Sequence, residues 1–172
     1  MNLISFKDPF RITRQIRLAG VFLALQILLA LPFSLVVNAD AAEQSIKSGN
    51  LIISSAWARA MLPGQPTGGG YMTIENLGSE PDRLIAITSA NAATVEIHQM
   101  SMDDNVMKMR QITDGLEIPA GGKVELSPGG LHLMFKQVKA PFQVADTVKV
   151  TLEFAKSGKI DVEMPVGFTN PD

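Results

Sequence analysis

The sequence predicts an all-β sandwich with Greek-key connections over residues 42–172. Apolar and polar residues alternate in short runs, which is typical of half-buried strands. Clusters of Gly and Pro separate these runs at regular intervals, as turns do in sandwiches and barrels. After the first 41 residues, no window of about eleven or more residues has the period of an amphipathic helix. This part of the chain is long enough to bury a core of its own.

The expected elements follow the chain in order. Residues 42–50 are polar and predict an irregular lead-in, and the Gly- and Pro-rich stretch 63–70 predicts a loop. Strands are predicted over residues 51–53, 56–60, 71–76, 83–89, 93–100, 106–112, 123–126, 131–136, 147–154 and 160–166. Turns are expected at residues 78–82, 119–122, 127–130 and 157–158, where Gly, Pro, Asp and Ser gather.

The first 41 residues have the composition of a secretory leader. Four basic residues precede an apolar run over residues 18–37, and Ala39 and Ala41 then have the A-x-A spacing of a cleavage site. We therefore expect residues 1–41 to be a signal peptide and residues 42–172 to be one exported domain, in the periplasm or otherwise outside the cytoplasm. An uncleaved anchor is the alternative, because about 20 apolar residues can span a bilayer.

Charge and cysteine content exclude several classes of function. The chain has 15 Lys and Arg against 17 Asp and Glu, and loss of residues 1–41 would leave 11 against 15, a net charge of −4. An acidic domain without a basic cluster is a poor ligand for nucleic acid, so none is expected as a partner, and membrane contact is expected only through an uncleaved leader. There is no cysteine, so neither disulfides nor thiolate ligands are available. Methionine is the soft ligand that remains, and eight of the nine lie beyond residue 60.

Both histidines of the chain occur in the same short pattern, His98-Gln99-Met100 and His132-Leu133-Met134. Residues i and i+2 of a strand share a face, so each imidazole is expected beside a thioether. The apolar residues of both strands have the opposite parity. The pattern therefore predicts that the two His-Met pairs face away from the core, toward solvent.

Met107 and Met109 form a third pair of candidate residues, which the chain brings back to the same end of the domain. Residues 102–109 predict a hairpin turn, after which Met107 and Met109 share a face. Thioether is soft and uncharged and suits Cu(I), whereas a structural zinc site or a blue-copper centre would need thiolates or further histidines. A lone His is usually a surface residue and a lone Met usually fills a core. Two His-x-Met copies that use every histidine favour a Cu(I) site instead.

The spacing of these residues resembles the signature of the PCu(A)C family of periplasmic copper chaperones. His98 is followed by ten residues and Met109, and 22 residues then precede His132-Leu133-Met134, one more than is usual in the family. The segments 56–60, 70–76, 115–122 and 128–134 also resemble family segments, and the likeness covers about residues 51–154.

The resemblance implies a cupredoxin-like Greek-key β-sandwich that binds Cu(I). It implies His98, Met109, His132 and Met134 as the ligands. Met100 matches an optional methionine of the family and is a candidate auxiliary ligand. Met107 is an alternative to Met109 as the metal ligand, because the two residues share a face. Met72 and Met164 are expected to pack in the core, and Met61 and Met102 are left without a role.

The function expected from this resemblance is that of a metallochaperone, not an enzyme. It would deliver Cu(I) to an acceptor, such as the copper subunit of cytochrome c oxidase during assembly or another copper chaperone. One alternative is a copper-dependent redox enzyme, which is disfavoured because no catalytic constellation accompanies the site. A copper-storage or tolerance protein and a structural or adhesion sandwich are further alternatives. Trp57 and Arg59 share a strand face, which permits a cation–π contact of structural character.

Overall fold

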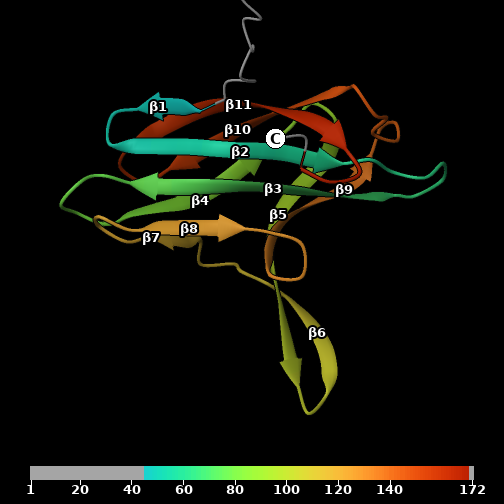
Figure 1. Cartoon of the computed structure of the whole chain (residues 1–172), viewed down its shortest axis with the longest axis horizontal. Helices are drawn as coiled ribbons and strands as arrows, with labels where there is room; N and C mark the ends of the chain where they lie inside the picture. Colours follow the sequence, from blue (N-terminus) through green and yellow to red (C-terminus); the bar gives the residue numbers. More distant parts are fainter. Residues whose placement is uncertain (1–44, 171–172) are drawn as a thin grey trace, which may run out of the picture. The chain divides into compact units, whose positions relative to one another are not determined.

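The computed structural model describes residues 45–170, and this part of the chain consists of strands and connecting turns (Figure 1). The strands are β1 Ile46–Ser48, β2 Leu51–Arg59, β3 Thr67–Asn76, β4 Asp82–Thr88, β5 Ala92–Asp103, β6 Val106–Gln111, β7 Leu116–Ile118, β8 Lys123–Leu126, β9 Leu131–Val138, β10 Thr147–Phe154 and β11 Gly158–Gly167. Residues 45–170 contain no helix, which confirms the predicted all-β class.

The strands form two layers that are joined along one edge. One layer has the order β6-β5-β9-β3-β2, with β1 paired to β2 and β8 paired to β3, and the other has the order β11-β10-β4-β7. The layers meet where β11 pairs with β2 in parallel, which is the one parallel pairing recorded among the described strands. The chain crosses repeatedly between the layers, since β3 leads to β4 and β4 leads to β5. This is the arrangement of a β-sandwich.

The core lies between the layers and takes alternate residues from both of them. In β10 and β11 every second residue is buried, as a period of two requires. Fully buried side chains include Leu51, Ile53, Met72, Ile74, Leu84, Ile118, Leu126, Leu133, Phe135, Val148, Leu152 and Met164. Met72 and Met164 are therefore core residues, as predicted. Burial of each such side chain contributes about 1.5–3 kcal/mol, so the domain holds together without a disulfide.

The predicted loop over residues 63–70 is wrong in its second half, because β3 begins at Thr67 and runs through the three glycines. These glycines allow close packing. A Cβ at Gly68 would lie 2.7 Å from the Phe142 ring, and a Cβ at Gly70 would lie 2.8 Å from the Phe135 ring. The glycines are consistent with a strand because they leave room for two buried aromatic rings.

The two strands predicted at residues 51–53 and 56–60 form one continuous strand, β2, which contains a β-bulge. Ser54 pairs with Thr73 and Trp57 pairs with Tyr71, so β2 has one residue more than β3 over this stretch. The bulge includes Ser55, whose φ of 51° is in the left-handed region. It brings Trp57 onto the outer face of the sheet beside Tyr71. Strands β1 and β7 were not predicted, and β1 lies within the stretch 42–50 that was expected to be irregular.

Asp82, at the start of β4, fixes the turn between β10 and β11. Its carboxylate accepts hydrogen bonds from the backbone N–H groups of Lys156 and Ser157, at 3.0 Å each, and from the Ser157 hydroxyl at 2.6 Å. It also accepts one from the backbone N–H of Arg83. Burial raises the pKa of Asp82, but these hydrogen bonds outweigh burial and hold the pKa below its usual value.

The predicted leader, residues 1–41, lies outside the described residues. Within residues 45–170, no helix has the length and apolar character needed to cross a membrane.

Candidate metal centre

The two histidines lie side by side on neighbouring strands. In the antiparallel register of β5 and β9, His98 is directly opposite His132, and their ring centroids are 5.9 Å apart at an interplanar angle of 53°. The preceding pair in the register, Ile97 and Leu133, is buried in the core. The histidines therefore occupy the outer face of this layer, as their parity predicts.

One feature of this face differs from the prediction. His132 was expected to face solvent, but it is only 8% exposed. His132 belongs to a row of side chains across the sheet. Trp57 pairs with Tyr71, and His132 pairs with His98. The pairing of Gly70 with Leu133 places Tyr71 opposite His132, which completes the row. The bulky neighbours in this row explain the burial. The position of His132 on the non-core face was correct, and its exposure was not.

An arginine covers the far end of the row. The Arg59 guanidinium lies 5.9 Å from the centroid of the Trp57 ring and 5.4 Å from that of the Tyr71 ring, so the predicted cation–π contact is confirmed and extends to a second ring. Burial raises the pKa of Tyr71, although the charge of Arg59 opposes the shift. The phenol beside His132 is therefore neutral at ordinary pH.

Hydrogen bonding assigns the proton of His98 to one ring nitrogen. His98 Nε2 lies 2.8 Å from Glu96 Oε2, and the other carboxylate oxygen accepts a hydrogen bond from Lys136 Nζ at 3.0 Å. The bonds from His98 and then from Lys136 hold the pKa of Glu96 below its usual value, so the carboxylate is ionised and only accepts. Nε2 therefore carries the proton. The lone pair is on Nδ1, which is buried and has no hydrogen-bond partner among the described residues.

His132 has the opposite arrangement. Its Nδ1 lies 3.1 Å from the carbonyl oxygen of Gly130. A carbonyl can only accept, so Nδ1 carries the proton and Nε2 keeps the lone pair. Each imidazole thus has one nitrogen held by a hydrogen bond and one with a free lone pair, which is the usual arrangement of a histidine that binds a metal.

The candidate methionines surround this pair on the same face. Met134 follows His132 by two residues on β9. Met109 is opposite Met100 in the β5–β6 register, and this pair lies two positions further along the hairpin than the pair of His98 and Gln111. Met107 lies a further two residues away, opposite Met102. At about 3.3 Å per residue, Met107 is roughly 7 Å farther than Met109 from the histidines.

An open pocket of about 240 Å³ borders the centre. Its lining includes His132, Met134, Tyr71 and Arg59, together with Met61 from the turn after β2. Sequence analysis gave Met61 no role, because its distance along the chain from the histidines hides its place in the fold. The Met61 sulfur would lie 3.0 Å from a Cβ at Gly68. The Met61 side chain therefore packs against the edge of the core and not within the row that contains the histidines.

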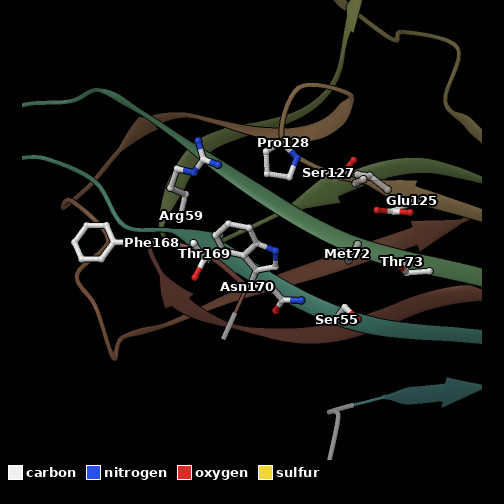
Figure 2. A pocket seen from close by; sticks show the side chains of 12 residues that line it. Ser55, Arg59, Met72, Thr73, Glu125, Ser127, Pro128, Phe168, Thr169 and Asn170 are labelled. Carbon is white, nitrogen blue, oxygen red and sulfur yellow. The ribbon is translucent and has the colours of Figure 1, made fainter. Parts of the chain in front are cut away.

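A separate pocket of about 340 Å³ lies on the other side of Arg59. Figure 2 shows Arg59, Phe168 and Pro128 around it. It contains neither histidine, and its one methionine, Met72, is buried in the core. This pocket is therefore not part of the candidate metal centre. Among residues 45–170, no three His, Cys, Asp or Glu side chains are grouped to hold a metal ion, so a site at the histidines needs the thioethers.

Comparison with known proteins places the domain in a family. The profile of a family described as "Putative lipoprotein LpqE-like" matches residues 51–166. The chain belongs to the LpqE-like family. One relative, "Putative lipoprotein Lxx21020" of Leifsonia xyli subsp. xyli, is 31% identical over 114 residues, which cover 66% of this chain and 68% of the relative. Protein RP573 of Rickettsia prowazekii is 28% identical over 101 residues, and the match spans 56% of its length.

Solved structures of PCuAC domains have the same fold. The copper-bound PCuAC domain from PmoF2 is 26% identical, with a TM-score of 0.63 over 73% of this chain and 99% of that domain. The apo form of the PmoF2 domain is 27% identical, with a TM-score of 0.62 over 72% and 94%. The solution structure of Cu(I)-DR1885 from Deinococcus radiodurans is 25% identical, with a TM-score of 0.55 over 76% and 84%. The resemblance to the PCu(A)C family is thereby confirmed.

Proposed function

We propose that this protein binds one Cu(I) ion through His98, His132, Met109 and Met134, and carries it to an acceptor protein outside the cytoplasm. The observation that carries the proposal is the direct pairing of His98 with His132 on the outer face of the sheet. Two solved relatives of the same fold are described as copper-bound or as the Cu(I) form, which supports the choice of metal.

The chemistry of the donor set fits Cu(I). Within the described part of the chain, each imidazole has a lone pair that no hydrogen bond uses, and the buried Nδ1 of His98 is available to bind a metal ion. The thioethers add soft, neutral donors, which favour Cu(I) over Zn or Mg. A site of two imidazoles and two thioethers places no negative charge on the ion, and we infer that it holds the ion less permanently than thiolates would.

Among the methionines, proximity favours Met109 over Met107. Met109 lies two register positions from the His98 pair, whereas Met107 lies four positions away. Met100 is opposite Met109 and remains an auxiliary candidate. Met109 is 50% exposed, so an acceptor can approach this side of the ion directly. Buried His132 and exposed Met109 thus give the centre one fixed side and one open side.

The proposed role is delivery rather than catalysis. Among residues 45–170, no nucleophile or paired carboxylate lies beside the histidines, and the carboxylate of Glu96 is bound to His98 and Lys136. The leader predicted from sequence and the lipoprotein description of the family support a location outside the cytoplasm. We propose as the acceptor another copper protein, either the copper subunit of cytochrome c oxidase or a further copper chaperone.

Anaerobic titration with Cu(I) against a chromophoric chelator tests the binding step. We expect one tight equivalent in the full-length protein, lost in the double variant His98→Ala/His132→Ala. The control is Met164→Leu, which removes a core thioether at nearly constant volume. If wild type and the double histidine variant bind equally, the assigned site is wrong. Incubation of the loaded protein with an apo-acceptor tests delivery, and retention of all the copper would indicate storage instead.

A further inference from the structure

The hairpin of β5 and β6 extends beyond the histidines and away from the sandwich (Figure 1). Residues 101–111 are all exposed. The turn uses Asp104 and Asn105, whose φ values of 48° and 62° are both positive, as in the type I′ turn that closes a two-residue hairpin. The hairpin is therefore a regular, well-specified element whose side chains contact solvent on both faces.

The two faces of this hairpin differ in chemistry. Beyond His98, one face holds two facing pairs of methionines: Met100 with Met109, and Met102 with Met107 at the tip. The opposite face is largely polar. It contains the ion pair of Lys108 with Asp103 and a hydrogen bond from Arg110 to Gln99.

Packing does not account for the pair at the tip. Met102 is 63% exposed and Met107 is 58% exposed, whereas Met72 and Met164 are almost fully buried. Methionine ordinarily fills gaps in cores, and β-branched or aromatic residues are preferred in strands. Two thioethers that face each other in solvent instead offer two soft donors to one ion, with no charged group between them on their face.

We propose that Met102 and Met107 form a second, weaker Cu(I) site at the hairpin tip, made of thioethers alone. The pair Met100 and Met109 lies between this site and the histidines, so sulfur atoms continue along the hairpin in steps of two residues, about 7 Å each. The tip site loads and releases the ion at the most exposed part of the protein, and the histidine site holds it. The loading role depends on the proposed function, whereas binding at the tip does not.

Titration with Ag(I), a redox-stable soft ion of the same charge as Cu(I), tests this site. The full-length protein is labelled at its methionine methyl groups, and their NMR signals are followed through two equivalents. We expect the second equivalent to shift the methyl signals of Met102 and Met107. The buried methyls of Met72 and Met164 are internal references and should not shift.

Two variants separate the tip from the histidine centre. Met102→Leu/Met107→Leu keeps side-chain volume and removes both sulfurs, and it should weaken the second equivalent by at least about tenfold while leaving the first unchanged. His98→Ala/His132→Ala should lose the first equivalent and retain binding at the tip.

Three results would overturn the proposal of a separate tip site. The first is that the methyl signals of Met102 and Met107 stay unshifted in the wild-type titration. The second is that the Met102→Leu/Met107→Leu variant still binds the second equivalent of Ag(I) with wild-type affinity. The third is that this variant no longer binds the first equivalent. A first equivalent that survives the histidine variant, with tip binding intact, would overturn the proposed function and leave the tip site standing.

Discussion

Substitution of Glu96 tests most directly whether a hydrogen bond fixes the orientation and the protonated nitrogen of the His98 ring. The carboxylate of Glu96 accepts a hydrogen bond from Nε2–H of His98 at 2.8 Å and another from Lys136 Nζ at 3.0 Å. The side chains of His98 and Glu96 are 12% and 17% exposed, so water competes poorly for this hydrogen bond. In Glu96→Ala, the His98 ring loses both its fixed orientation and the partner that leaves Nδ1 free.

The expected loss is one of metal affinity with the fold retained. Removal of a carboxylate that orients a metal-binding imidazole commonly weakens metal binding by about ten- to a hundredfold, or about 1.4–2.8 kcal/mol. The affinity of Glu96→Ala for Cu(I) should fall within that range. In Lys136→Met the bond from His98 to Glu96 remains, so the loss should be no more than about threefold, as for an exposed ion pair.

Competition against a Cu(I) chelator under anaerobic conditions measures these affinities. Glu163→Ala is the matched control, because it makes the same change in charge at an exposed ion pair on the other layer. Long-range proton–nitrogen NMR of the apo protein gives an independent readout, since it reports which ring nitrogen of His98 carries the proton. An affinity of Glu96→Ala within about twofold of wild type would refute the reasoning, as would wild-type apo protein in which His98 Nδ1 is protonated.

The remaining predictions concern the centre and the fold. Cu(I) affinity should fall as the pH is lowered, because protonated imidazole cannot bind a metal, and a flat profile would assign binding to thioethers alone. Met109→Leu should weaken binding of the first Cu(I) more than Met107→Leu does, and the same titration decides the order. Asp82→Asn should lower the free energy of unfolding by about 1–3 kcal/mol at pH 7, since an amide cannot accept all of the hydrogen bonds. The folded-state pKa of Asp82 is depressed, so this contribution is present above about pH 4 and is lost as pH falls through the folded pKa, which denaturation at several pH values checks. Gly70→Ala should cost about 1–3 kcal/mol by overpacking the core, whereas Gly130→Ala, with its nearest contact at 3.5 Å, should cost less.

The sequence predicted the face of the sheet on which the histidines lie. Alternation in a strand is local, and a fully buried neighbour such as Leu133 leaves His132 only the opposite face. The hairpin that returns Met109 toward His98 was also predictable, because the turn is short. The strand boundaries at β10 agree for the same reason, since apolar alternation there is uninterrupted.

The contacts made by distant segments could not be predicted in this way. Strand β3 continues through Gly68 and Gly70 because two aromatic rings need that space, and only the fold brings those rings there. The burial of His132 depends on Tyr71, which the bulge in β2 leaves beside Trp57. His98 and Glu96 are close in sequence, but the strength of their hydrogen bond depends on the limited exposure of both side chains, which the fold determines.

The central claim is that two imidazoles and two thioethers share one Cu(I) ion. X-ray absorption at the copper K-edge, on the full-length protein with one equivalent of Cu(I), counts the nitrogen and sulfur neighbours directly. We predict two of each, and loss of the nitrogen contribution in His98→Ala/His132→Ala. A copper environment without sulfur, or one of sulfur alone that the histidine variant leaves unchanged, would contradict this account.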